Sequence, residues 1–197
     1  MAAMAKLSEN ELFTYADYLT WPDGERWELI DGEAYMMSPA PSRKHQEISI
    51  ELASQFHVFL KGKPCRVYDA PFDVRLPQHA DQPDDEIETV VQPDIVVVCD
   101  RSKLDDKGCK GAPDLVIEIL SPSTSKMDMQ NKFFLYQRVG VKEYWLVHPF
   151  DKTVMVFRRN DQNEFGRAEM YASDDRVSVP LLGELIIDLK DVFSEQG

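Results

Sequence analysis

The sequence contains only three cysteines and has little positive charge. Cys65, Cys99 and Cys109 are odd in number and form no closely spaced pair, which argues against a disulfide framework and against a zinc knuckle. The chain has 22 lysines and arginines against 35 aspartates and glutamates, so its formal net charge is −13. Because non-specific nucleic-acid binding depends on basic residues, this balance argues against a dedicated DNA-coating protein. It is compatible with an enzyme that meets DNA only at a metal-filled cleft.

Long apolar runs are also missing. The longest, such as Ile95 to Cys99, are far shorter than the roughly 18 residues that a membrane span needs. The first residues contain no apolar segment followed by a cleavage site, so we expect no signal peptide and a cytoplasmic protein. A chain of 197 residues that is 43% hydrophobic and 29% charged is typical of a globular protein, and we expect a single domain over residues 1–197.

Hydrophobic periodicity predicts alternating helices and strands. The dipeptide Asp31-Gly32 is a strong hairpin signal, so the runs 26–30 and 33–38 should pair. The runs 90–98 and 114–120 are rich in Val and Ile, as is typical of strands buried on both faces. Helices are expected at 11–19, 43–60 and 127–139, a strand pair within 66–76, a mobile loop at 78–89, and further strands at 142–147, 153–157, 167–171 and 180–189. This pattern predicts an α/β fold, a mixed β-sheet flanked by helices, with an N-terminal hairpin and a C-terminal antiparallel extension.

Three carboxylates accompany the two apolar strands. Asp94 and Asp114 each follow a proline at a strand start, and Glu118 lies within the second strand between apolar neighbours. Burying a carboxylate costs several kcal/mol unless it is paired or bound to metal, so Glu118 is the most anomalous residue of the chain. Asp94 and Glu118 could share one Mg²⁺, which prefers oxygen ligands. The alternatives are a strand-entry turn for each aspartate, which we prefer for Asp114, and a buried salt bridge for Glu118.

The helix after Glu118 offers a candidate cation. Asp128, Lys132 and Tyr136 are spaced four residues apart and therefore share one helix face. Lys132 follows Glu118 by one turn of chain and one turn of helix, close enough to reach the same cleft. The alternative is an ordinary surface pair between Asp128 and Lys132.

Taken together, these segments resemble the Uma2 family of restriction-endonuclease-like proteins, within the PD-(D/E)XK nuclease superfamily. The order and spacing carry the resemblance, which runs through about residues 26–149. The matching pieces are Glu28-Leu-Ile-Asp-Gly32, Met37-Ser-Pro39 with His45, Gln92-Pro-Asp94, Pro113 to Ser123, the helix residues Asp128, Lys132 and Tyr136, and Gly140 to Trp145.

The resemblance implies a restriction-endonuclease-like core that holds Mg²⁺, or Mn²⁺, through Asp94 and Glu118. Superfamily members usually carry a lysine two residues after the glutamate, but Leu120 stands there. We therefore expect Lys132 to supply the missing ammonium from the helix. His45 and Glu28 are further matches that should line the same cleft. The family usually has an aspartate where this chain has His148, to which we assign no catalytic role.

The leading hypothesis is a Mg²⁺-dependent endonuclease that hydrolyses phosphodiester bonds in DNA. Basic residues at 43–44, 61, 63 and 66 support it, although the acidic net charge favours an alternative, a catalytically silent nuclease-fold protein with a binding or regulatory role. A third hypothesis is a metal-dependent hydrolase of smaller phosphoesters. Cutting both DNA strands takes two sites, so we expect a homodimer.

Overall fold

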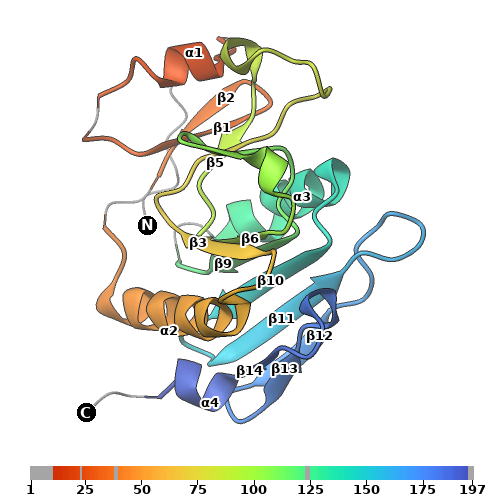
Figure 1. The fold of residues 1–197 in the computed structure, drawn as a ribbon. Coiled ribbons are helices and arrows are strands. Elements are labelled where there is room, and N and C mark those ends of the chain that lie inside the picture. The colour runs from red at the N-terminus through yellow and green to blue at the C-terminus, as the bar shows by residue number, and fades with distance from the viewer. Residues whose placement is uncertain (1–10, 23, 38–39, 123–124, 195–197) are drawn as a thin grey trace.

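The computed structural model describes residues 11–22, 24–37, 40–122 and 125–194, which form a mixed α/β arrangement of sheets and helices (Figure 1). Two six-stranded sheets and one two-stranded sheet account for the described strands. No helix in these ranges is long and apolar enough to cross a membrane. Ser38, Pro39 and Ser123 of the matching segments lie outside the described residues.

The central sheet has the strand order β12-β11-β10-β9-β6-β3. β9 and β10 are parallel, with Glu118 opposite Leu146, whereas the other neighbours are antiparallel. Both of these strands are buried on both faces, as the Val- and Ile-rich run 114–120 predicts for β9. The strands are β3 (Arg66–Asp69), β6 (Ile95–Val98), β9 (Leu115–Ile119), β10 (Glu143–His148), β11 (Thr153–Arg158) and β12 (Glu169–Ala172).

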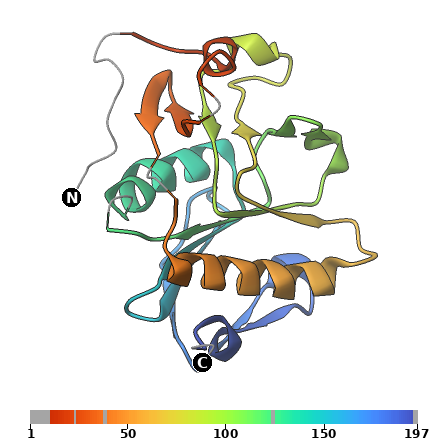
Figure 2. The same ribbon diagram turned by 90° about the vertical axis from the view of Figure 1, so that its left-hand side faces the viewer.

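The two faces of this sheet are covered by different layers. Helix α2 (Arg43–Leu60) packs on the face that carries Ile117 and Trp145, together with the C-terminal helix α4 (Leu189–Val192) and the strands β13 (Arg176–Ser178) and β14 (Ile186–Asp188). Helix α3 (Phe133–Val139) packs on the other face, which carries Val116 and Leu146. Figure 2 shows the central sheet between these layers. Strand alternation places Glu118 on the α3 side.

The second six-stranded sheet has the order β2-β1-β5-β4-β8-β7. Its first hairpin confirms the prediction, because Ile30 pairs with Glu33 and both turn residues, Asp31 and Gly32, have positive φ angles of 51° and 79°. The strands are β1 (Trp27–Ile30), β2 (Glu33–Met36), β4 (Val74–Arg75), β5 (Val90–Val91), β7 (Leu104–Asp105) and β8 (Gly108–Lys110). Helix α1 (Tyr15–Tyr18) and 3₁₀ turns at Asp84–Glu86 and Arg101–Lys103 accompany these strands, and a further 3₁₀ turn, Pro180–Leu182, lies between β13 and β14.

The apolar run 90–98 is not one strand. It divides into two strands with the segment 92–94 between them. β5 belongs to the second six-stranded sheet, called the hairpin sheet from here on, and β6 belongs to the central sheet. Pro93 lacks a backbone N–H and interrupts the pairing, which the apolar character of the run conceals. Asp94 therefore stands where the chain crosses from one sheet to the other.

Other predicted elements are also corrected. The strands within 66–76 do not pair with each other, because β3 joins β6 and β4 joins β5 and β8. The helix expected at 11–19 is limited to α1. The helix at 127–139 begins as a π-helical turn, Met127–Lys132, and continues as α3 to Gly140, whose φ of 95° ends it as predicted. The loop 78–89 contains a 3₁₀ turn whose Asp84 is paired with Arg75.

The expectation that the cysteines form no disulfide is wrong for one pair. Cys65 and Cys99 are joined by a disulfide, while Cys109 is free and buried. The cause is strand pairing, because Arg66 of β3 lies opposite Val98 of β6, so the residues just beyond them meet. Their separation of 34 residues in the sequence gives no sign of this contact.

Candidate active site

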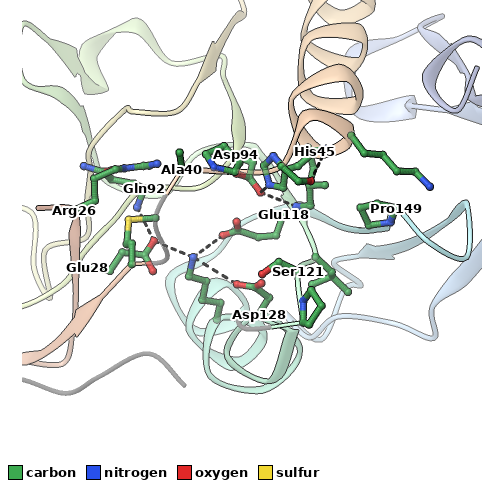
Figure 3. Close-up of a pocket in the computed structure, with 18 of the residues that line it drawn as sticks. Arg26, Glu28, Ala40, His45, Gln92, Asp94, Glu118, Ser121, Asp128 and Pro149 are labelled. Carbon is green, nitrogen blue, oxygen red and sulfur yellow. Dashed lines mark hydrogen bonds and ion pairs between the residues drawn. The ribbon is translucent and has the colours of Figure 1, made fainter. Parts of the chain in front are cut away.

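The carboxyl ends of the parallel strands β9 and β10 open into a pocket of about 590 Å³ (Figure 3). All five residues predicted for the site line it, although they come from five different parts of the fold. Glu28 lies on β1, His45 on the first turn of α2, Asp94 between the sheets, Glu118 on β9, and Lys132 at the end of the π-helical turn. The ends of parallel strands are where open α/β sheets commonly bind ligands.

Glu118 is only 4% exposed and is held through one of its two oxygens. Its Oε1 accepts hydrogen bonds from Lys132 Nζ at 3.0 Å and from Tyr136 Oη at 2.9 Å. Burial raises the pKa of Glu118 well above its usual value, the positive charge of Lys132 opposes this, and neighbouring carboxylates add to it. No hydrogen bond from the described residues engages Oε2 of Glu118.

Lys132 stands among three carboxylates. Its Nζ lies 2.9 Å from Glu28 Oε1, 3.0 Å from Glu118 Oε1 and 3.6 Å from Asp128 Oδ1. Burial alone would lower the pKa of this ammonium, but the negative charges of Glu118, Glu28 and Asp128 outweigh it and raise the pKa well above the usual value. Lys132 is therefore charged and faces Glu118, as the helix-face argument predicts. The contact with Lys132 is also the buried salt bridge that was the alternative interpretation of Glu118.

The π-helical turn helps to aim these side chains. Asp128, Lys132 and Tyr136 are all buried. Asp128 and Lys132 line the inner end of the pocket, called its floor from here on, and Tyr136 donates to Glu118 there. π turns often occur at functional sites. The carbonyl of Asp128 accepts a hydrogen bond from Tyr144 Oη of β10 at 3.0 Å, which ties the turn to the central sheet. Burial, with the negative charge of Glu118, raises the pKa of Tyr136 well above its usual value, so its hydroxyl stays protonated and donates to Glu118.

Asp94 is fixed beside Glu118 by the backbone of β9. Its Oδ2 accepts the N–H of Ile119 at 2.7 Å and lies 3.3 Å from His45 Nε2. Burial would lower the pKa of His45, but the hydrogen bond and the negative charge of Asp94 raise it overall. The two predicted carboxylates, Asp94 and Glu118, therefore lie on one pocket and not on opposite faces of the sheet.

Glu28 connects the hairpin sheet to this floor. It is fully buried, and its Oε1 accepts the backbone N–H of Gln92 at 2.8 Å as well as the Lys132 contact. Its buried Oε2 has no hydrogen-bond partner among the described residues. Four acids, Glu28, Asp94, Glu118 and Asp128, thus line the same pocket as one lysine, and three of them contact its ammonium, so acids outnumber lysine on the pocket floor.

This donor set fits a hard divalent cation. Mg²⁺ takes oxygen ligands, is commonly bound through one or two carboxylates, and keeps several waters. Asp94 and Glu118 each line the pocket with one oxygen that accepts no protein hydrogen bond from the described residues, so they are the residues that could hold such an ion. The described chain contains no ready-made cage of three or more His, Cys, Asp or Glu side chains.

Asp114 has a different environment from the pocket carboxylates. Its Oδ2 accepts the N–H of Cys99 at 2.7 Å, its Oδ1 is paired with Lys142 Nζ at 2.7 Å, and it does not line the pocket. Asp114 therefore joins β6 to β9, which agrees with the structural role expected for it.

Several pocket residues were not found from the sequence. Arg26 donates to Gln92 Oε1 from Nε at 3.1 Å and from Nη2 at 2.9 Å, and Gln92 in turn donates to Tyr18 and Asp73. Arg26 lies two residues before Glu28, so strand alternation could have placed it on the same face. Lys44 was among the basic residues taken to support DNA binding, but its place at this pocket was not expected. Pro149 and Phe150 gave no signal, because the chain turn that brings them to the pocket is not visible in the sequence.

Comparison with a family model and with individual proteins shows what the chain is similar to. A family model described as "Uma2: Putative restriction endonuclease" matches residues 15–190. An uncharacterised protein of Synechocystis sp. PCC 6803, slr1290, is 28% identical over 185 residues, covering 92% of this chain and 89% of its own. A second Synechocystis protein, sll1609, is 25% identical over 152 residues, covering 75% and 81%. A crystal structure described as "a putative nuclease belonging to DUF820" from Anabaena variabilis superposes with a TM-score of 0.71 and 26% identity, covering 92% of this chain and 97% of that one.

Proposed function

The chain belongs to the Uma2 family, and on this basis we propose that it is a Mg²⁺-dependent nuclease that hydrolyses phosphodiester bonds in DNA. One observation carries the proposal. Asp94 and Glu118 line the same pocket as the charged Lys132, so two acids and an ammonium face the space where a phosphate would lie. The Anabaena structure, described as "a putative nuclease", shares the fold.

Each residue has a distinct part in this proposal. Asp94 and Glu118 would hold the cation through the oxygens that accept no hydrogen bond from the described residues, and Mn²⁺ could replace Mg²⁺. The bound cation would supply an acidified water and polarise the phosphate. Lys132 holds Glu118 in place through their ion pair, and its positive charge would stabilise charge that develops on the phosphate. His45 orients Asp94 through their hydrogen bond, and Glu28 positions Lys132.

The test is cleavage of DNA by the purified protein, offered both as supercoiled plasmid and as a single-stranded circle, with Mg²⁺, with Mn²⁺ and with EDTA. We expect cleavage with either metal and none with EDTA. Glu118→Gln should lower the cleavage rate at least about a hundredfold, because it weakens binding of the cation and removes a carboxylate from the pocket.

The matched control is Glu143→Gln. Glu143 is also a buried strand glutamate, 2% exposed on β10, but its partners are Trp145 and Arg158 and it does not line the pocket. This variant should cleave at the parent rate. No cleavage by the parent with either metal would contradict the proposal, as would a Glu118→Gln protein that cleaves normally.

The alternative is a catalytically silent protein that uses the same pocket for binding or regulation. The net charge of −13 favours it, because nucleases usually present a basic groove to DNA. Retained metal binding without cleavage of any nucleic acid would support this alternative.

We also propose a homodimer, because cutting two strands of a duplex takes two sites, and closed two-fold dimers are the commonest oligomers. Light scattering coupled to size-exclusion chromatography measures the mass directly. A particle of 22.6 kDa, the mass of one chain, would contradict the dimer.

A further inference from the structure

One wall of the pocket carries an aromatic ring that the core does not use. Pro149 and Phe150 follow β10 directly, and both line the pocket. The Phe150 side chain is 77% exposed, although phenylalanine is usually buried. Lys44, from the first turn of α2, places its Nζ 5.4 Å from the centre of the Phe150 ring. A flat apolar surface and a cation therefore stand together at the mouth of the pocket.

The floor of the pocket is recessed. Glu118 is 4% exposed and Lys132 is 3% exposed, so a phosphate must enter the pocket to meet them. A volume of about 590 Å³ is in the range of small-ligand pockets, which suits one nucleotide and not a stacked duplex. Enzymes that act within such pockets either take single strands or extrude a nucleotide from the stack.

We propose that the pocket takes one unpaired nucleotide, whose base stacks on Phe150 while its phosphate lies toward Asp94 and Glu118. The substrate is then an unpaired DNA strand, such as a single strand, a flap or a frayed end, and not an intact duplex. This assignment rests on the proposed nuclease function, which it makes more specific.

The charge distribution supports a substrate held locally. With a net charge of −13, most of the surface repels a long duplex, so binding must come from short-range contacts. Two cations line the pocket away from its floor, Arg26 and Lys44. Figure 3 shows Arg26 and Pro149 on opposite sides, with Glu118 between them, so a strand crossing the pocket would run from the Arg26 side to the Phe150 side. Stacking on aromatic rings binds any base and needs no sequence match.

The test measures binding separately from cleavage. The probe is a fluorescein-labelled oligothymidylate, alone or paired with oligodeoxyadenylate, in Ca²⁺ to keep the strands uncut, and the readout is fluorescence anisotropy. The single strand should bind at least about tenfold more tightly than the duplex, and Phe150→Ala should weaken single-strand binding about tenfold, the loss expected for one stacked base. Phe150→Trp should restore it.

The matched control is Phe134→Ala. Phe134 is also an exposed phenylalanine, 65% exposed, but it lies on α3 and does not line this pocket. Its variant should bind the single strand as the parent does. Equal affinity for strand and duplex, or parent-like binding by Phe150→Ala, would overturn the assignment and would point to Phe150 as a contact for a protein partner.

A cleavage assay with Mg²⁺ separates this inference from the proposed function. Cleavage of closed duplex and single strand at equal rates, unchanged by Phe150→Ala, would overturn the inference and leave the nuclease function standing. Phe150-dependent binding of single strands without cleavage of any DNA would overturn the nuclease function and leave the nucleotide pocket standing.

Discussion

Glu28 Oε1 lies 2.9 Å from the ammonium of Lys132, and both side chains are buried. This ion pair joins β1 of the hairpin sheet to the π-helical turn that packs on the central sheet. Removing one partner of a buried pair leaves an uncompensated charge, which is strongly destabilising. The pocket floor and the packing of the two sheets therefore depend on the same contact.

Replacing Lys132 should lower the stability of the folded protein and also slow cleavage. Lys132→Met keeps the length of the side chain but leaves Glu28, Glu118 and Asp128 without their cation, which should lower the free energy of unfolding by about 3–5 kcal/mol. Urea denaturation followed by fluorescence measures this change. The double variant Lys132→Met, Glu28→Gln should recover part of the loss, and a double variant no more stable than the single one would contradict this account.

Metal binding should depend on Asp94 and Glu118 but not on Asp114. Asp94→Asn and Glu118→Gln should each weaken Mn²⁺ binding at least about tenfold, since even partners of metal ligands contribute that much. Asp114→Asn should leave Mn²⁺ affinity unchanged, because Asp114 binds Cys99 and Lys142 outside the pocket. Calorimetric titration provides the affinities. If Asp114→Asn bound Mn²⁺ as weakly as Glu118→Gln does, Asp114 would belong to the site.

Acid should destabilise the hairpin sheet through Asp84. The hydrogen bond from Lys110, helped by the charges of Arg75 and Lys107, lowers the pKa of Asp84 below its usual 3.8, against a smaller opposing effect of burial. A lowered pKa in the folded state means that the stabilisation is complete above about pH 4 and is lost as the pH falls through the folded value.

The urea midpoint measured at about pH 6 and at about pH 3 tests this expectation. The parent should lose stability between the two, and Asp84→Asn should lose less. An equal drop for the two proteins would assign the acid sensitivity to other carboxylates.

Reduction of the Cys65–Cys99 disulfide should lower stability by about 2–4 kcal/mol, the usual contribution of such a bond. Cys65→Ser should reproduce this loss and should be insensitive to dithiothreitol. Cys109→Ser is the control. Because Cys109 forms no disulfide, this substitution should leave the change in stability caused by dithiothreitol as it is in the parent. A parent protein with the same urea midpoint with and without dithiothreitol would contradict the expectation.

The sequence was most informative where a residue conflicted with its surroundings. Glu118 stands in an apolar strand, and a buried carboxylate needs a partner, so the pocket floor and the facing Lys132 could be predicted. The hairpin at Asp31 and Gly32 could be predicted because two positive φ angles require that kind of dipeptide. The mixed sheet with flanking helices followed from the periodicity of the apolar positions.

The remaining features depend on contacts between distant segments. Cys65 and Cys99 meet only because β3 and β6 happen to pair in that register. Phe150 reaches the pocket because β9 and β10 are parallel neighbours and end together. Local patterns record which residues are buried but not which strands are adjacent, so neither contact could be predicted.

The division of 90–98 between two sheets also has a consequence for how the protein is made. On the ribosome, a chain that has emerged only as far as β9 carries Glu28, Asp94 and Glu118 but not Lys132, so its three acids have no counter-charge. Phe150 emerges later still. The pocket is complete only when both sheets have closed on the π-helical turn, so a nascent or truncated chain displays no finished site, and the candidate site is acquired together with the native fold.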